Sequence, residues 1–417
     1  MTKCPFRNTL YTNDNLYVLS GLNSESVDLI YLDPPFNSKR MYSAPVGSKA
    51  AGASFKDMWT WKDVDEYYLD TLADQFPALA QYITNVGVVH SKPMMAYLTY
   101  MSQRIVEMHR VLKNTGSLYL HCDPTASHYL KILLDFAFGK NNFRNEIIWY
   151  YKKWASARNV FVRSHDTIFR YAKSQKYTHN QLYIPRAEST LRRFGNKTIV
   201  SGAKDDYGKR VPSVTLDEDS VGTKMNDVWT IPIIAPSSAE RTGYPTQKPL
   251  ALLKRIILAS SNEGDTVMDP FCGCATTCVA AQQLQRKWIG IDIEKQAVKV
   301  LIQRLSDDAG LFKDFTATDQ IPKRSDLKIM LPSQSVKEKL YKQQDGKCNA
   351  CGREFEIWDF EIDHIIPKSK GGGDYYENYQ LLCGSCNRIK GDRPMEYLRL
   401  KIETRERMMK NKIFFGE

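Results

Sequence analysis

The feature that most constrains the fold is an alternation of strand-like and helix-like segments, which occurs twice along the 417-residue chain. Short apolar runs bounded by turn residues predict strands, and longer runs with apolar residues three and four positions apart predict helices. The predicted strands are 27–33, 116–123, 266–270 and 287–293, and the predicted helices are 94–112, 127–139, 248–261, 275–285 and 294–305. Strands that alternate with helices form parallel sheets covered by helices, so we predict an α/β fold.

The first predicted strand, VDLIYLD, runs directly into Pro34, Pro35 and Phe36. Two consecutive prolines fix φ twice and remove two backbone donors, so the segment can neither continue a helix nor stay inside a sheet. It predicts a rigid shelf at a strand end that carries the Asp33 carboxylate, bare carbonyls and an aromatic ring. Such a shelf suits a flat ligand with an amino group, although a plain strand-ending turn is the simpler explanation of the tetrapeptide alone.

A second strand end, DPFCGCATT (269–277), stands directly before a predicted helix. Gly273 and Ala275 are small enough to let the backbone approach a ligand, and the helix N-terminus faces it. Asp292 ends the next strand, in the position where an acidic side chain can hold ribose hydroxyls. The segment therefore predicts a nucleoside site, although turns of this kind also occur for packing alone. The chain has no GxGxxG motif and no P-loop lysine, which argues against a dinucleotide or a nucleoside triphosphate.

Three motifs in a fixed order, DPPF, YPTQKPLALLKRII (244–257) and DPFxGxxT, resemble the DNA amino-methyltransferases over residues 10–305. The order of catalytic motif, target-recognition region and cofactor motif is that of the beta class. The resemblance implies a Rossmann-like sheet that binds S-adenosyl-L-methionine. The residues it implies for cofactor binding are Asp14, Gln247, Lys248, Asp269, Phe271, Gly273, Ala275, Thr276 and Asp292. Ala275 stands where the family usually has a second glycine, and we expect cofactor binding to be retained.

The same resemblance gives the four shelf residues catalytic roles. If the Asp33 carboxylate and the Pro34 carbonyl each accept one N–H of an exocyclic amine, the nitrogen can pyramidalise and its lone pair is freed for methylation. Pro35 keeps the shelf rigid, and Phe36 offers a stacking face for a target base flipped out of double-stranded DNA. In the family, Asp-Pro-Pro accompanies adenine N6 more often than cytosine N4, so we predict adenine and keep cytosine as the alternative.

Positive charge is concentrated in residues 140–210, which contain 16 Lys and Arg against 5 Asp and Glu. That excess equals the net charge of the whole chain, +11, and aromatic residues are interleaved with the cations. Phosphate contacts combined with stacking faces suit nucleic acid. We therefore predict that this stretch binds DNA, with Lys152, Lys153, Arg158 and Arg163 as candidate contacts; a merely solvated basic surface is the alternative.

Two C-x-x-C pairs near the C-terminus predict a structural zinc site of four thiolates, formed by Cys348, Cys351, Cys383 and Cys386. The sequence between and after them resembles the HNH, or ββα-metal, nucleases. This resemblance implies that His364 takes a proton from water, that Asn378 orients its ring, and that Asp363 and Asn387 hold Mg²⁺ or Mn²⁺. A lone histidine is usually a satisfied core residue, but the Asp-His pair and the framing cysteines favour the nuclease.

We thus predict an α/β methyltransferase with a small C-terminal ββα-metal zinc module. The predicted parts are 1–139 (catalytic half), 140–245 (target recognition), 246–305 (cofactor half), 306–336 (linker) and 337–417 (nuclease-like zinc domain). The alternatives are a methyltransferase whose zinc module only binds DNA and, last, a purely structural DNA-binding protein. Related methyltransferases often form dimers, but no residue here indicates a homodimer.

The sequence lacks a membrane-spanning apolar run and a signal-peptide core, and its cysteine pairs suit metal binding in a reducing cytosol. We therefore expect a cytoplasmic protein of a prokaryotic cell or a phage-infected host, with no membrane partner.

Overall fold

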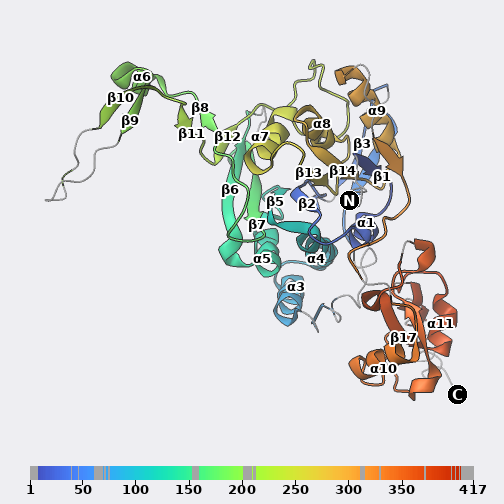
Figure 1. Ribbon diagram of the computed structural model, residues 1–417. Helices are drawn as coiled ribbons and strands as arrows, with labels where there is room; N and C mark the ends of the chain where they lie inside the picture. The colour runs from blue at the N-terminus through green and yellow to red at the C-terminus, as the bar shows by residue number, and fades with distance from the viewer. Residues whose placement is uncertain are drawn as a thin grey trace.

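The computed structural model describes residues 8–404, apart from 39, 46, 61–68, 70–71, 74–75, 153–158, 201–208, 210–212, 310–314, 328–329, 371, 396, 400 and 403. Its centre is one nine-stranded sheet in the order β12-β6-β7-β5-β2-β13-β14-β1-β15 (Figure 1). The strands are β1 (Thr9–Tyr11), β2 (Val27–Leu32), β5 (Leu112–Cys122), β6 (Phe143–Tyr150), β7 (His165–Ala172), β12 (Val228–Thr230), β13 (Thr266–Asp269), β14 (Lys287–Ile291) and β15 (Thr316–Thr318). β7 runs antiparallel to β5 and β6, whereas the other pairs are parallel. The predicted α/β fold with a parallel sheet is confirmed.

Helices cover both faces of this sheet because alternate strand residues point to opposite sides. Ile30 and Leu32 of β2 face one layer, which contains α1 (Asn15–Gly21), α3 (Pro77–Val89), α4 (Lys92–Val111) and α5 (Ser127–Phe138). Leu29 and Tyr31 face the other layer, which contains α7 (Leu250–Ser260) and α8 (Thr276–Gln283). α9 (Gln296–Ala309) follows β14. Since β2 is buried on both faces, it is apolar at nearly every position.

Two predicted boundaries differ from the structure. β6, β7 and β12 lie within the predicted target-recognition region 140–245, yet they extend the central sheet. The predicted linker 306–336 contains β15, which pairs with β1 at the sheet edge, and the last turn of α9. Both corrections have one cause: short strands acquire their register from neighbours far away in sequence, and those neighbours are not visible in local composition.

A set of small elements lies outside the central sheet. β3 (Arg40–Ser43) and β4 (Ser54–Asp57) form a hairpin. β8 (Tyr183–Ile184) pairs with β11 (Thr223–Lys224), and β9 (Lys197–Val200) pairs with β10 (Val214–Asp219). Figure 1 shows these two pairs and α6 (Glu188–Phe194) projecting from the sheet edge beside β12. A short 3₁₀ turn, Lys140–Asn142, precedes β6.

The C-terminal module, drawn in orange to red in Figure 1, is a separate ββα unit. β16 (Phe360–His364) pairs antiparallel with β17 (Tyr379–Cys383), and α11 (Gly384–Lys390) follows β17 and packs on both strands. α10 (Gln334–Gln343) and the 3₁₀ turns Ile357–Asp359, Lys368–Lys370 and Tyr376–Asn378 complete the module. Within the described residues, no helix is both long enough and apolar enough to cross a membrane.

Candidate functional site

The sheet brings the two polar strand ends together. β2 and β13 are parallel neighbours, so the DPPF segment after β2 and the DPF segment after β13 emerge at the same edge. A cavity of about 300 Å³ opens there. The predicted residues that line it are Asp14, Asp33, Pro34, Pro35, Phe36, Gln247, Lys248, Asp269, Phe271, Gly273, Thr276 and Asp292. Carboxyl ends of adjacent parallel strands form the usual crevice of open α/β sheets, which explains why motifs far apart in sequence share one site.

Asp33 has one engaged and one unengaged carboxylate oxygen. Its Oδ2 accepts a hydrogen bond from Lys248 Nζ, and the two side chains are only 16% and 10% exposed. Its Oδ1 is buried and has no hydrogen-bond partner among the described residues, with His121 Nδ1 4.0 Å away. Lys248, which the resemblance implied for cofactor binding, therefore contacts the catalytic shelf. The free oxygen is available to accept a donor at the cavity wall.

Asp292 also lines the cavity, beside the Gly273 turn. Its Oδ2 accepts from the backbone N–H of Gly273 at 2.8 Å, and its Oδ1 accepts from the backbone N–H of Glu294 at 2.8 Å. Burial raises the pKa of Asp292 to about 6, and the two N–H donors offset part of that rise. A carboxylate has about four acceptor positions, so two remain for a ligand.

Gly273 is needed at this turn for two reasons. Its φ is +49°, in the left-handed region, and a Cβ added there would lie 2.9 Å from the Tyr244 ring. Ala275 also has a left-handed backbone, with φ 57° and ψ 34°, at the N-cap of α8. Ala275 is fully buried and does not line the cavity, so its methyl group points away from the ligand space. The Ala that replaces the family's second glycine thus adds backbone strain without narrowing the site.

The remaining predicted cofactor residues hold the loops around the cavity. Asp269 accepts hydrogen bonds from the Phe271 N–H and the Thr277 hydroxyl, and burial raises its pKa to about 7. Asp14 caps α1 through Leu16 N–H and pairs with Arg104 at 3.0 Å.

Two further side chains brace neighbouring loop segments. Gln247 accepts from Thr242 and donates to the Glu240 carbonyl. Thr276 Oγ1 accepts from Arg304 at 2.8 Å. Together, the Gly273 turn and the spare Asp292 acceptors fit the nucleoside part of the S-adenosylmethionine that the motifs imply.

Sequence reasoning missed His121 and Asp166. Leu32 of β2 pairs with Leu120 of β5, so His121 stands beside Asp33 at the same sheet edge. His121 Nε2 lies 3.1 Å from Asp166 Oδ2, and its Nδ1 lies 3.0 Å from the Tyr31 hydroxyl. The available signal was HCD at the end of GSLYLHCD, a polar cluster that follows an apolar strand just as Asp33 does.

Residues 140–210 expose fewer aromatic and basic side chains than their composition predicted. Trp149, Phe169 and Tyr171 are buried in the sheet and are not stacking faces, because their side chains pack into the core on either side of β6 and β7. Arg170 is 4% exposed and donates to His179 and to the Thr178 carbonyl.

The predicted DNA contacts of this stretch divide into two groups. Lys152 and Arg163 are exposed, as is Phe161, whose side chain is fully accessible. Lys153 and Arg158 lie outside the described residues.

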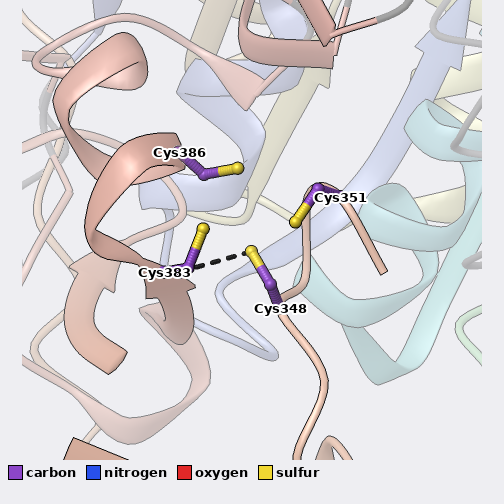
Figure 2. Close-up of side chains that lie close together, drawn as sticks. All are labelled: Cys348, Cys351, Cys383 and Cys386. Atoms are coloured by element: carbon purple, nitrogen blue, oxygen red, sulfur yellow. Dashed lines mark hydrogen bonds between the residues drawn. The ribbon is translucent and has the colours of Figure 1, made fainter. Parts of the chain in front are cut away.

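The four predicted zinc ligands form one cluster in the C-terminal module. Their Sγ atoms all lie within 4.8 Å of one another, and Figure 2 shows them converging from the loop before β16 and from the start of α11. The Cys383 N–H donates to Cys348 Sγ. Hydrogen bonding from Cys386 and from nearby backbone N–H groups lowers the pKa of Cys348 below its usual value. Converging thiols of this kind are the donor set of a structural zinc site.

His364 sits at the end of β16 and is oriented by Asp374, which the sequence reasoning missed. His364 Nε2 lies 2.9 Å from Asp374 Oδ1, and Lys368 and Tyr379 also donate to this carboxylate. The hydrogen bonds from Lys368 and His364 lower the pKa of Asp374 to about 2. Asn378 was predicted to orient the ring, and this is corrected. Its amide instead bonds to the backbone of Ile366 and Gly373, which closes the glycine-rich loop.

The two predicted magnesium ligands are engaged by other side chains. Asp363 accepts from the buried Lys390 at 3.0 Å and from Gln380 Nε2 at 2.8 Å. The Asn387 amide donates to Glu361. The Asn387 bond uses the amide nitrogen and not the oxygen that was predicted to bind the metal. Of the predicted pair, Asp363 is therefore the one whose oxygens are engaged, because the Lys390 ammonium lies beside it.

Comparison with known proteins agrees with these two regions. A family model described as DNA methylase matches residues 27–304, and one described as HNH endonuclease matches residues 348–393. The chain is 29% identical to the DNA adenine methyltransferase YhdJ of Escherichia coli K12, over 71% of this chain and 82% of that protein. It is 28% identical to the type II methyltransferase M.EcaI of Enterobacter cloacae, over 78% of this chain and 75% of that protein. The solved structure of TTHA0409 from Thermus thermophilus, complexed with S-adenosyl-L-methionine, is 17% identical with a TM-score of 0.44 over 75% of this chain and 98% of that one.

Proposed function

The chain belongs to the DNA methylase family and carries an HNH endonuclease domain, and from this premise we propose that its first domain methylates adenine N6 at specific sites in double-stranded DNA. The observation that carries the proposal is that one cavity is lined both by Asp33, which has an unpartnered carboxylate oxygen, and by Gly273 and Asp292. The adenine assignment is supported by the relative named as a DNA adenine methyltransferase.

The shelf residues divide the chemistry among them. The Asp33 Oδ1 and the Pro34 carbonyl accept the two N–H groups of the target amine, which localises the nitrogen lone pair. Lys248 holds the other Asp33 oxygen, so the carboxylate cannot rotate away from the amine. Phe36 supplies the face on which the flipped base stacks. The bound S-adenosylmethionine supplies an electrophilic methyl group. The amine loses a proton toward Asp33 once it is alkylated, so a strong base is not required.

We propose that Asp292 and the Gly273 turn hold the nucleoside part of the cofactor, with Asp14 near its base. Lys152 and Arg163, with Lys153 and Arg158 between them in sequence, supply phosphate contacts. The four cysteines hold zinc, which stabilises the C-terminal module and leaves no coordination position for catalysis.

Long-read sequencing of DNA from cells that express the protein tests the methylation directly. We expect N6-methyladenine at one recognition sequence with the wild type and none with Asp33→Ala. Modified cytosine would contradict the adenine assignment, and unmodified DNA with a folded, expressed protein would contradict the function.

For the C-terminal domain we propose endonuclease activity, with His364 taking the proton of the attacking water through Nδ1. A second candidate is a module that binds DNA without cutting it, and the pairing of Asp363 with Lys390 favours this alternative. Nicking of supercoiled plasmid with Mg²⁺ or Mn²⁺ separates them. Cleavage that is lost in His364→Ala supports the nuclease, and no cleavage of unmodified or self-methylated DNA supports the binding module.

A further inference from the structure

His121 is a buried histidine of the methyltransferase domain that takes no direct part in the chemistry of the shelf. It follows the apolar run of β5, is 0% exposed, and has both ring nitrogens engaged. A histidine satisfied in this way usually serves packing alone. Its location is different from that of an ordinary core residue, because β5 places it next to the strand end that carries Asp33.

The ring of His121 lies against the catalytic shelf. It stacks on Phe36 with centroids 5.9 Å apart and an interplanar angle of 29°. Trp149 also packs edge-on against the His121 ring, with centroids 5.5 Å apart and an interplanar angle of 88°. Phe36 lines the cavity whereas His121 does not, so the His121 ring acts as the backing against which Phe36 is held. Lys248 Nζ also lies over the Phe36 ring, 5.7 Å from its centroid.

A hydrogen-bonded chain fixes the orientation of this backing ring. The Tyr151 hydroxyl donates to Asp166 Oδ1 at 3.1 Å, and Asp166 Oδ2 accepts from His121 Nε2 at 3.1 Å. Burial alone would raise the pKa of Asp166, but the hydrogen bond and charge of His121 hold it below its usual value. Asp166 therefore stays ionised and accepts the Nε2–H of His121. The other nitrogen, Nδ1, then faces the Tyr31 hydroxyl and lies 4.0 Å from Asp33 Oδ1.

We propose that His121, oriented by Asp166, is a positioning residue for methyl transfer that holds the Phe36 ring in the plane needed to receive the flipped base. The proposal rests on the methyltransferase function proposed above. Without the backing ring, Phe36 can turn into the vacated space, and the base loses its stacking platform. Since stacking offsets part of the cost of flipping, the defect must depend on how firmly the target adenine is paired.

The test compares His121→Gln with wild type on two DNA duplexes that differ only in whether the target adenine is paired or mispaired. Gln keeps a donor for Asp166 but removes the ring. We expect kcat/KM on paired DNA to fall by about 10- to 100-fold, as for a misplaced reacting group. On mispaired DNA, where flipping costs less, most of that loss should disappear. Calorimetric binding of S-adenosylmethionine should be unchanged, because His121 does not line the cavity.

His109→Gln is the matched control. His109 on α4 also packs edge-on against a phenylalanine, Phe138 at 4.9 Å, but it does not line the cavity. This variant should methylate both duplexes like wild type. If His121→Gln is also unaffected, or loses activity equally on both duplexes, the positioning role is wrong.

Asp166→Asn keeps the test decisive if His121→Gln fails to fold. This substitution preserves the side-chain volume but weakens the hydrogen bond that orients His121. We therefore expect a smaller loss of kcat/KM, again mainly on DNA in which the target adenine is paired. An equal loss on both duplexes would again overturn the proposal. Absence of methylation by the wild type itself would instead refute the underlying function, so the two failures are distinguishable.

Discussion

The two candidate sites of this chain use the same set of side chains, two aspartates, a lysine and a histidine, with opposite accessibility. At the methyltransferase shelf, Asp33 is paired with Lys248, and the neighbouring His121 is bonded to Asp166. In the C-terminal module, Asp363 is paired with Lys390, and the neighbouring His364 is bonded to Asp374, in a similar arrangement.

The difference lies in which group faces the substrate side. His121 is fully buried while Asp33 keeps one oxygen free at a cavity wall. His364 is 19% exposed, whereas both oxygens of Asp363 are engaged by Lys390 and Gln380. Under the proposed functions, the carboxylate is therefore the working group in the first site and the histidine supports it. In the second site the histidine is the accessible group, and the aspartate beside it is structural as arranged here.

The largest effect is expected for Asp33→Ala. Removing the free acceptor should lower methyl transfer by at least about 100-fold, as loss of a preorganised polar group at a reacting atom does. Binding of S-adenosylmethionine, measured by calorimetry, should change little, because the proposed cofactor contacts are made by Asp292 and the Gly273 turn. Methyl transfer within about tenfold of wild type would show that Asp33 is not the group that accepts the target amine.

In the C-terminal module, the corresponding prediction concerns the carboxylate behind the histidine. Asp374→Asn should reduce divalent-ion-dependent DNA cleavage by about 10- to 100-fold, since the general base loses the partner that orients it. Its unfolding temperature should fall modestly, because Asp374 also accepts from Lys368 and Tyr379, so cleavage is compared at a temperature where the variant is folded.

Asn378→Ala is the contrasting variant in the same loop. It should lower the unfolding temperature, because the buried amide makes three hydrogen bonds to the loop backbone. If Asn378→Ala loses cleavage at full stability while Asp374→Asn cleaves normally, then Asn378 orients the ring after all.

A smaller effect is expected on the affinity for S-adenosylmethionine when the pH changes. Asp292 has a pKa of about 6 in the folded protein, so it is ionised at pH 7.5 and mostly protonated at pH 5. An ionised carboxylate accepts ribose hydroxyls better, so affinity for S-adenosylmethionine should fall severalfold between these values. Folding stability should change in the opposite direction. The folded state binds more protons than the unfolded one between pH 3.8 and about 6, so stability falls as pH rises through that range.

Asp292→Asn provides the control for the pH experiment. It should bind more weakly at pH 7.5 and lose most of the pH dependence. Any slope that remains belongs to Asp269, whose pKa is raised to about 7. If the affinity for S-adenosylmethionine depends on pH in Asp292→Asn as it does in the wild type, Asp292 does not contact the ribose.

The smallest predicted effect concerns the salt dependence of DNA binding. Replacing Lys152 and Arg163 by Gln should reduce the slope of log affinity against log salt by about 0.9 for each phosphate that is no longer neutralised. The matched pair is Arg192 and Arg193 on α6, which are exposed cations on the projecting hairpins. If only the Arg192 and Arg193 replacement changes the slope of log affinity against log salt, the DNA contacts lie on the projecting hairpins and not at the sheet edge.

The sequence by itself determined the alternation of strands and helices, the two polar strand ends and the four converging cysteines. These features are local: a proline pair ends a strand, a glycine permits a left-handed turn, and two C-x-x-C pairs supply four soft ligands. The shelf residues and Asp292 could therefore be named as site candidates before any coordinates were known.

Only the tertiary structure decided which side chains meet. Lys248 contacts Asp33 across 215 positions, and His121 meets Asp166 across 45. Trp149 and Tyr171 interleave with cations in the sequence, yet they are buried because β6 and β7 join the central sheet. The partner of His364 proved to be Asp374 and not Asn378. In each case the outcome depends on strand register and loop closure, which are set by packing between distant segments and leave no periodic signal in the chain itself.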